Sequence, residues 1–500
     1  MDLFFFLGAF FLFCLMLVKI VKKSKTVKLP PGPKKLPIIG NMHQLIGSLP
    51  HRILADLAKK YGPLMHLQLG EVSTVVVSSA DAAKDILNTF DALFANRPTL
   101  LTSTILFYNN TDISFSPCGD YWRQLRKICT MELLTARRVQ TFGSIREDEV
   151  LNMIKSISSQ KGTVVNLTAK LRSLTLSITT RAAFGKRSKY HDEFLSLMDD
   201  VVMLMSGFSI MDMYPSFKIL ERITGIRHKL ETLHKKIDEV LENILNEHRV
   251  KRAEWKPENG EAKQNLLDVL LNVQQSGEFG APLADNNIKA VIFDIFAAGG
   301  ETSPTTMGWT MAEMIKNPTV FRRAQDEVRQ IYGEMGNVDE SRLHELKYLH
   351  AVIKEALRLH PAAPLLLPRE CSEKCEIQGY EIPVNTRILI NAWAIGRDSQ
   401  HWTEPEKFFP ERFLDSEIDF KGTTFNYIPF GGGRRMCPGI SFALPVIELP
   451  LAQLLYHFDW KLPNNDLQQE QLDIAEVFGV VVRPKQDLLL IPIPYHHSSI

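Results

Sequence analysis

Cysteine is scarce in this sequence, with six among 500 residues. So few thiols do not make a disulfide framework, which favours a reducing compartment. An excess of either charge is also missing, because 58 basic residues face 57 acidic ones, and no nucleic-acid partner is therefore expected. The sequence has no dinucleotide-binding fingerprint and no flavin segment, so electrons for any redox chemistry must come from another protein.

The N-terminus carries a long apolar run. Residues 3–18 contain no charge and are followed by five lysines between Lys19 and Lys28. A helix of about 17–25 apolar residues spans a bilayer, and the lysines place the following chain on the cytosolic side. A cleaved signal peptide is the alternative, but it needs positive charge before the run, where this chain has Asp2. We predict a retained single-pass anchor over residues 1–28.

The rest of the chain is predicted to be mainly α with small β-sheets. Four prolines between Pro30 and Pro37 stiffen residues 29–40 into an extended hinge, and residues 41–500 are taken as one folded unit. Two strands are expected within residues 64–79, with a turn at Glu71 and Val72, and a polar loop over residues 251–265. Helices are predicted over residues 50–61, 120–133, 144–159, 223–251 and 286–316.

The helix predicted over residues 286–316 is apolar in its first half, yet its centre holds two successive glycines ending at Gly300, and then Pro304. A glycine costs about 1 kcal/mol and a proline about 3 kcal/mol inside a helix, and Pro304 removes the donor that would meet the Gly300 carbonyl. This loss favours a functional distortion at which the Thr302 hydroxyl holds a water or small ligand. The alternative is a packing kink in which Thr302 only bonds the Ala298 carbonyl.

Residues 430–439, FGGGRRMCPG, place three consecutive glycines and two arginines just before the thiol of Cys437. A phosphate-binding loop would need a Gly-Lys-Ser/Thr sequence. A nucleophilic cysteine would need a nearby base, and no histidine here carries a recognisable signature. An axial thiolate ligand of haem iron fits better, because glycines let the loop approach a flat macrocycle and Arg435 can pair with a propionate.

These motifs together resemble those of the cytochrome P-450 superfamily. Phe430-x-x-Gly433-x-Arg435-x-Cys437-x-Gly439 matches the cysteine-ligand loop of that family. Glu355-x-x-Arg358, with PERF at 410–413, matches its structural triad. AGGET at 298–302 matches its oxygen-activation turn. With the anchor and the proline hinge, the resemblance covers essentially the whole chain. The sequence is most similar to plant microsomal members (class II, A-type), in particular to terpenoid hydroxylases.

The resemblance implies a cytochrome P-450 fold behind the transmembrane anchor, with haem b (iron protoporphyrin IX) as cofactor. It also implies two sets of residues. The haem-binding set is Cys437, as axial ligand of the iron, with Phe430, Trp122, Arg126, Arg369 and Arg435. The structural triad is Glu355, Arg358 and Arg412.

The resemblance further implies monooxygenation. Glu301 and Thr302 would relay the protons that are needed to cleave O2. Electrons would come from NADPH through NADPH-cytochrome P-450 reductase in the endoplasmic reticulum membrane, with the catalytic domain facing the cytosol. A haem-binding sensor without turnover is the alternative, but a sensor has no use for a proton relay.

The substrate is expected to be a small lipophilic specialised metabolite. By analogy with the family, seven residues are expected to line its pocket: Ile113, Phe208, Asp294, Ala298, Ala363, Leu366 and Phe478. Their segments are mostly apolar, which suits a sesqui- or diterpenoid. An alkaloid, or a phenolic or flavonoid, is the alternative substrate.

Overall fold

The structure is a computed structural model, and it describes residues 28–187, 189–205, 208–254, 265–277, 283–333, 336–463 and 475–495. Most of the predicted anchor (residues 1–27) and most of the predicted polar loop (residues 255–264) lie outside these ranges. Within them the chain is mainly helical with small β-sheets, as predicted.

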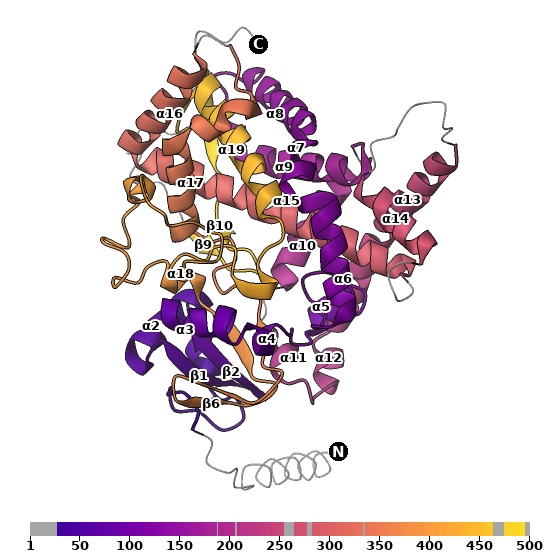
Figure 1. Cartoon of the computed structure of the whole chain (residues 1–500), viewed down its shortest axis with the longest axis vertical. Helices are drawn as coiled ribbons and strands as arrows, with labels where there is room; N and C mark the ends of the chain where they lie inside the picture. Colours follow the sequence, from indigo (N-terminus) through magenta and orange to yellow (C-terminus); the bar gives the residue numbers. More distant parts are fainter. Residues whose placement is uncertain are drawn as a thin grey trace, which may run out of the picture.

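Helices form the bulk of the molecule and surround the central helix α15 (Figure 1). The helices are α2 (Pro50–Tyr61), α3 (Ala80–Lys84), α4 (Asp91–Phe94), α5 (Leu101–Leu106), α6 (Asp120–Cys129), α7 (Ala136–Gln140), α8 (Gly143–Ser158), α9 (Leu167–Phe184), α10 (His191–Leu204), α11 (Ile210–Met213), α12 (Ile219–Ile223), α13 (Ile226–Glu254), α14 (Leu266–Ser276), α15 (Asp285–Lys316), α16 (Pro318–Tyr332), α17 (Lys347–Leu359), α18 (Ala392–Ile395) and α19 (Ile440–His457).

The strands are short and gather mainly at one end of the molecule (Figure 1). A mixed sheet has the order β1-β2-β7-β4, in which β2 and β7 are parallel and the other pairs are antiparallel. The strands are β1 (Leu64–Leu69), β2 (Val72–Val77), β3 (Val165–Asn166), β4 (Arg369–Glu370), β5 (Cys375–Ile377), β6 (Tyr380–Ile382), β7 (Arg387–Ile390), β8 (Phe458–Lys461), β9 (Glu476–Val477), β10 (Arg483–Pro484) and β11 (Leu489–Pro494).

Three predicted boundaries differ from the structure, each for a local backbone reason. The β1–β2 turn lies at Gly70 and Glu71, one residue earlier than predicted, because Gly70 adopts a φ of +60° and the β-branched Val72 already joins β2. The helix predicted over residues 223–251 is divided into α12 and α13 beside Gly225, whose φ is +65°. Helix α6 ends at Cys129 and continues as a π-helix.

Helix α15 runs unbroken for 32 residues through the core, despite Pro304. It packs against α9, α17 and α19, and side chains such as Phe293, Phe296 and Trp309 are buried along its length. The carbonyl of Gly300, which loses its helical donor to Pro304, lies 3.4 Å from the Thr175 hydroxyl of α9. The same hydroxyl lies 3.0 Å from the Arg172 carbonyl of its own helix, so its one proton is shared between two acceptors, and the neighbouring helix replaces the missing donor only in part.

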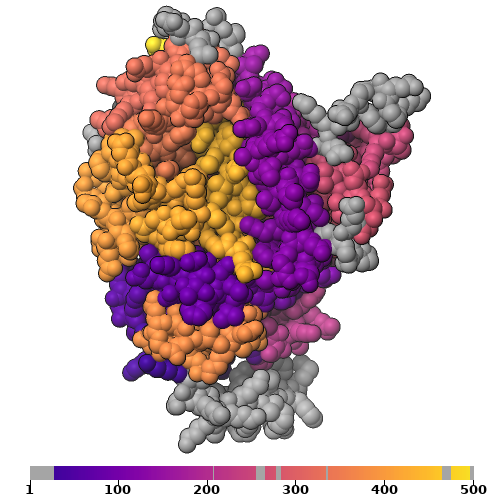
Figure 2. Space-filling view, viewed as in Figure 1, coloured from indigo at the N-terminus to yellow at the C-terminus, as the bar shows by residue number. Residues whose placement is uncertain are grey.

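Helix α19 follows the cysteine loop and is the other long apolar helix of the core. Among the described helices it is the one that is long and apolar enough to cross a membrane, but 67% of it is buried inside the protein. It packs against α7, α8, α16 and α17. On the face in Figure 2 this yellow segment lies between the purple segment that includes α6 to α8 and the orange segment that follows α17. We therefore describe α19 as a core helix.

Candidate functional site

The cysteine loop is held in a tight conformation just before α19. The backbone N–H of Cys437 donates to the Phe430 carbonyl at 3.0 Å. Gly433 has a φ of +65°, and a β-carbon there would lie 2.3 Å from the Leu87 carbonyl oxygen and 2.4 Å from the Asp91 carboxylate. No side chain fits at this position, so the loop packs backbone against backbone.

Opposing electrostatic effects act on the pKa of the Cys437 thiol. Burial raises the pKa of this thiol, whereas a hydrogen bond from the Gly439 backbone and the charge of Arg126 act to lower it. Arg126 also donates from Nη2 to the Met436 carbonyl at 2.5 Å. Positive charge and backbone donors are thus gathered around the sulfur atom, as a thiolate ligand requires.

Arg435 lies in the interior and is bound by backbone carbonyls. Its Nε, Nη1 and Nη2 donate to the carbonyls of Ala95, Ile113 and Ser116 at 2.8, 3.2 and 2.5 Å. The guanidinium carbon is 3.9 Å from the ring centroid of Trp122, a cation–π contact. The indole N–H of Trp122 donates to Ile113 at 3.0 Å.

Two further arginines lie close to Arg435. Arg369 donates to the Asp91 carboxylate at 2.9 Å and to the Gly432 carbonyl at 2.6 Å. Arg97, which the sequence analysis missed, donates to the carbonyls of Ser114, Leu367 and Pro368 at 2.7–2.8 Å. Arg97 precedes a proline in a loop, and no motif or periodicity marks it.

The arginines leave an excess of buried positive charge. Burial and the neighbouring Arg435 and Arg369 lower the pKa of Arg97, and burial lowers that of Arg435 to about 10. Asp91 is the acidic partner of Arg369, while Arg97 and Arg435 are bound by carbonyls. Buried cations are unfavourable unless an anion balances them. A cofactor with two carboxylates and a thiolate-bound metal matches this donor set, and haem b has that charge pattern.

The structure shows Glu301 and Thr302 on α15 with separate partners. The Thr302 hydroxyl donates to the Ala298 carbonyl at 2.7 Å, which is the local bond of the packing alternative. The Glu301 carboxylate accepts from Arg172 of α9 at 2.7 Å and lies 4.0 Å from Arg483. Burial raises the pKa of Glu301, and the Arg172 charge opposes this rise. The carboxyl group is thus buried but tied to a cation that reaches the surface.

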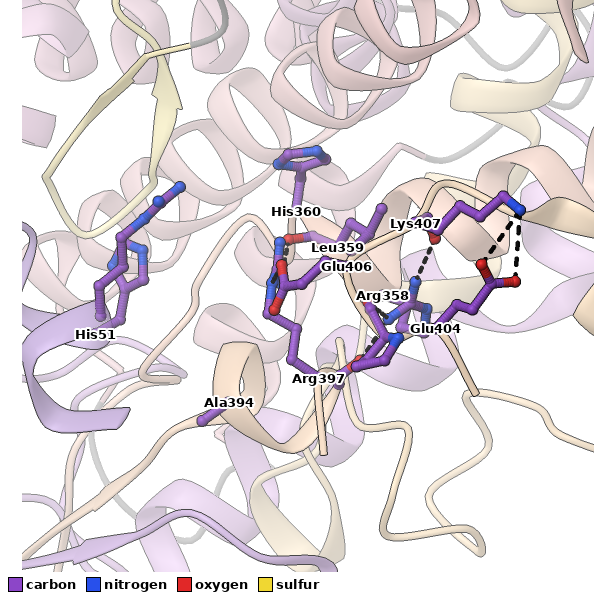
Figure 3. A network of polar contacts seen from close by, with 12 residues as sticks. His51, Arg358, Leu359, His360, Ala394, Arg397, Glu404, Glu406 and Lys407 are labelled. Atoms are coloured by element: carbon purple, nitrogen blue, oxygen red, sulfur yellow. Dashed lines mark hydrogen bonds and ion pairs between the residues drawn. The ribbon is translucent and has the colours of Figure 1, made fainter. Parts of the chain in front are cut away.

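Glu355 connects Arg358 and Arg412 in the core. Its carboxylate accepts from Arg358 Nε and Nη2 at 2.7 and 2.8 Å, from Arg412 Nε at 3.2 Å and from the Phe409 backbone N–H at 2.8 Å. Arg358 also donates to the Lys407 carbonyl, and Arg397 donates to the carbonyl of Leu359 beside it (Figure 3). This network joins α17 to the loop before the cysteine motif.

A narrow, mainly apolar pocket lies between the mixed sheet, α11 with the segment before it, and the loops at residues 364–368 and 478–480. Three of the seven expected pocket residues line it: Phe208, Leu366 and Phe478. The rings of Phe208 and Phe478 are 5.8 Å apart. Leu366 also borders the cysteine loop, since a β-carbon at Gly431 would lie 3.6 Å from it. Ile113, Ala298 and Ala363 are not among the described residues that line this pocket.

Asp294, expected as a pocket residue, is instead committed to a turn. Its carboxylate accepts from the backbone N–H groups of Ile113 and Ser114 and from the Ser114 hydroxyl, at 2.7–3.1 Å. Burial raises its pKa to about 6, and burial together with Asp294 also raises the pKa of Asp112. The sequence pattern predicted that Asp294 shares a helix face with Ala298 and Thr302, and the turn around Ile113 uses its oxygen atoms.

Comparison with known proteins agrees with this geometry. The family model described as Cytochrome P450 matches residues 30–491. Tabersonine 16-hydroxylase 2 of Catharanthus roseus is 56% identical over 100% of this chain and 99% of its own length. Premnaspirodiene oxygenase of Hyoscyamus muticus is 50% identical over 99% of both chains.

A solved structure of a zebra fish cytochrome P450 with abiraterone has the same fold. It superposes with a TM-score of 0.75 at 27% identity, over 90% of this chain and 99% of that one. The family match over residues 30–491 includes the cysteine loop, the arginines around it and helix α15. The chain belongs to the cytochrome P450 family and is a haem-thiolate oxidoreductase of the plant A-type.

Proposed function

We propose that this protein is a membrane-anchored monooxygenase that transfers one oxygen atom from O2 to a small lipophilic metabolite of plant specialised metabolism, with electrons from NADPH. The observation that carries the proposal is the buried positive charge of Arg97, Arg369 and Arg435 beside the Cys437 loop. A purely structural loop would not need three buried guanidiniums, of which Arg369 is paired with a carboxylate while the hydrogen bonds of Arg97 and Arg435 go to backbone carbonyls.

The residues around the loop have distinct roles in holding haem b. Cys437 would hold the iron through its thiolate, and the arginines with Trp122 would bind the propionates. A thiolate-ligated haem supplies O2 binding and favours O–O cleavage when bound. The lack of space for a β-carbon at Gly433 lets the loop pack tightly against Leu87 and Asp91, which would fix the position of the loop beside the macrocycle.

Thr302 and Glu301 are proposed to handle protons on α15. The Thr302 hydroxyl is half-buried and bonds the Ala298 carbonyl, so its oxygen lone pairs are free to accept from a water molecule. Glu301 exchanges protons with the surface through the site of Arg172 and Arg483. Together they form a polar route through an otherwise apolar helix.

The membrane proposal is supported by an apolar surface near the hinge. Ile38, Ile46, Ile219 and Ile223 are 51–79% exposed, and the Tyr214 hydroxyl donates to the Ile38 carbonyl, which joins the hinge to the segment between α11 and α12. Large exposed apolar side chains in one region are typical of an interfacial surface. We propose that this surface contacts the endoplasmic reticulum membrane beside a single-pass anchor at residues 1–28, with NADPH-cytochrome P-450 reductase as the partner.

Two substrate classes are supported equally. Relatives at 54–56% identity are named for tabersonine, an alkaloid, and one at 50% for premnaspirodiene, a sesquiterpene. The preference for a terpenoid therefore widens to an alkaloid or a sesquiterpenoid. Reductase-supplied microsomes with panels of terpenes, alkaloids and flavonoids would identify the class by product formation.

The ligand assignment is tested with Cys437→Ser. The wild-type protein, reduced and exposed to carbon monoxide, is expected to show the red-shifted absorbance band of a thiolate-bound haem. The variant should lose this band and its turnover, because a hydroxyl is not a thiolate ligand. Cys129→Ser, which changes another buried thiol, is the matched control and should keep the band. A normal band from Cys437→Ser would contradict the assignment.

A further inference from the structure

Arg387 is an exception on an apolar face of the mixed sheet. Side chains alternate along β7, so Ile388 and Ile390 pack into one apolar cluster, while Leu389 packs into another on the opposite face. Arg387 shares the face of Leu389, and both line the pocket. Only 5% of Arg387 is exposed. A guanidinium at a position that suits leucine needs a reason, because its burial is unfavourable.

The hydrogen-bonding capacity of Arg387 is only partly used. Nη2 donates to the Asp212 carbonyl at 3.1 Å, and Nη1 lies 3.9 Å from the sulfur of Met213, a weak acceptor. Nε is buried and has no hydrogen-bond partner among the described residues. An unsatisfied buried donor in a pocket wall is prepared to bind an acceptor.

The local charge favours a neutral acceptor. The Asp212 carboxylate lies near enough to Arg387 to oppose the lowering of its pKa by burial. One Asp212 oxygen accepts from the Leu101 backbone N–H at 2.8 Å, and the other is buried without a partner in the described part of the chain. A carbonyl accepts from Arg387, and a hydroxyl offers an acceptor as well as a donor.

The pocket is polar on the side of Arg387 and Thr102, and on the side of Leu366 it borders the cysteine loop. Apart from Arg387 and Thr102, its lining is apolar. Leu366 lines it and also borders Gly431 of the cysteine loop. A lipophilic molecule in this pocket therefore has the cysteine loop beside one part of its surface and a charged donor beside another.

We propose that Arg387 determines specificity by donating a hydrogen bond from its guanidinium, whose donors are only partly used, to a carbonyl or hydroxyl oxygen of the substrate. This inference rests on the proposed monooxygenase function. The preferred substrate is then a lipophilic molecule that already carries an oxygen function, and a plain hydrocarbon binds less tightly. In a reaction sequence, an oxygenating or acylating step must precede this enzyme.

The test compares matched ligand pairs that differ by one oxygen function. Holoenzyme is titrated with nootkatone and valencene, a sesquiterpene ketone and its hydrocarbon, and with tabersonine and its analogue that lacks the ester. The change in the haem absorbance band gives each Kd. A hydrogen bond from a charged donor predicts that at least one oxygenated member binds about 10–100-fold more tightly than its partner. In Arg387→Met this ratio should fall to near one.

Two controls separate recognition from folding. Ile388→Val changes the opposite face of β7, which does not line the pocket, so the ratio should stay as in the wild type. Arg387→Lys retains a charged donor and should keep part of the preference. If Arg387→Met weakens the binding of both members of each pair by the same factor, Arg387 has a structural role and the inference is overturned. The inference is also overturned if the wild-type protein prefers neither member of any pair, or binds none of the ligands. A missing carbon monoxide band would instead contradict the proposed function itself.

Discussion

Removal of the Glu355 carboxylate should prevent the formation of stable holoprotein. The side chains of Glu355 and Arg358 are 0% exposed and that of Arg412 is 9% exposed. In Glu355→Ala, four hydrogen bonds to the carboxylate are lost, and two guanidiniums stay in the core without an anion. Breaking a buried ion pair in this way costs about 3–5 kcal/mol.

The size of this loss decides what is observed. Arg358 retains the carbonyls of Gly396, Pro405 and Lys407 as acceptors, so the cost should not exceed the range above. A net stability of about 5–15 kcal/mol is typical of domains, so a loss of about 3–5 kcal/mol removes most of the stability of a domain at the lower end of that range, which is the case that this prediction assumes. Glu355→Gln keeps the shape and one acceptor oxygen, so an intermediate effect is expected.

The assay measures the haem content per protein from the carbon monoxide difference spectrum. It also measures how long this spectrum persists at elevated temperature, because large proteins often unfold irreversibly and their stability is then measured as a half-life. Asp56→Ala is the matched control. Asp56 and Lys59 also form an i, i+3 pair at 2.8 Å, but their side chains are 69% and 77% exposed, and such surface pairs contribute little. Haem incorporation in Glu355→Ala at normal yield and half-life would refute the reasoning.

Two further predictions concern protons and the membrane. In Thr302→Ala, product formation should fall while NADPH consumption continues, because general acid–base groups contribute about 10²–10⁴-fold to the reaction rate. The ratio of product formed to NADPH consumed measures this effect. An unchanged ratio would mean that the hydroxyl only bonds the Ala298 carbonyl. Deletion of residues 1–28 should release the protein from the integral-membrane fraction while the apolar surface at Ile219 and Ile223 retains peripheral binding. Resistance of the truncated protein to carbonate extraction would indicate a second span.

The sequence was most informative where structure depends on neighbours in the chain. Helix α2 begins at Pro50 and ends at Tyr61, as predicted, because proline suits the first turn of a helix and Gly62 and Pro63 end it. The Glu355–Arg358 contact follows from the i, i+3 spacing of these residues on one helix. The cysteine loop could also be identified from the sequence, because the residues of its motif lie within ten positions of one another in the chain.

Contacts between distant segments could not be predicted in this way. Arg97 meets carbonyls 17 and about 270 residues away, and no period or motif indicates such a contact. The donor from Thr175 to the Gly300 carbonyl is likewise supplied by another helix. The 3.6-residue period predicts the helix face of Asp294 on α15, but not the turn 180 residues earlier that uses its carboxylate. Side-chain partners of this kind become visible only in three dimensions.

The parallel pairing of β2 with β7 has a consequence for biosynthesis. Thr74 pairs with Arg387, so β2 waits for a partner that the ribosome makes roughly 310 residues later, or on the order of 15–60 s at typical rates of synthesis. During that time the edge of Val72–Val77, rich in β-branched residues, is open to pairing with other chains. A nascent chain that stalls before β7 would expose this edge permanently, which makes chaperone protection of the N-terminal hairpin a requirement for a high yield of this enzyme.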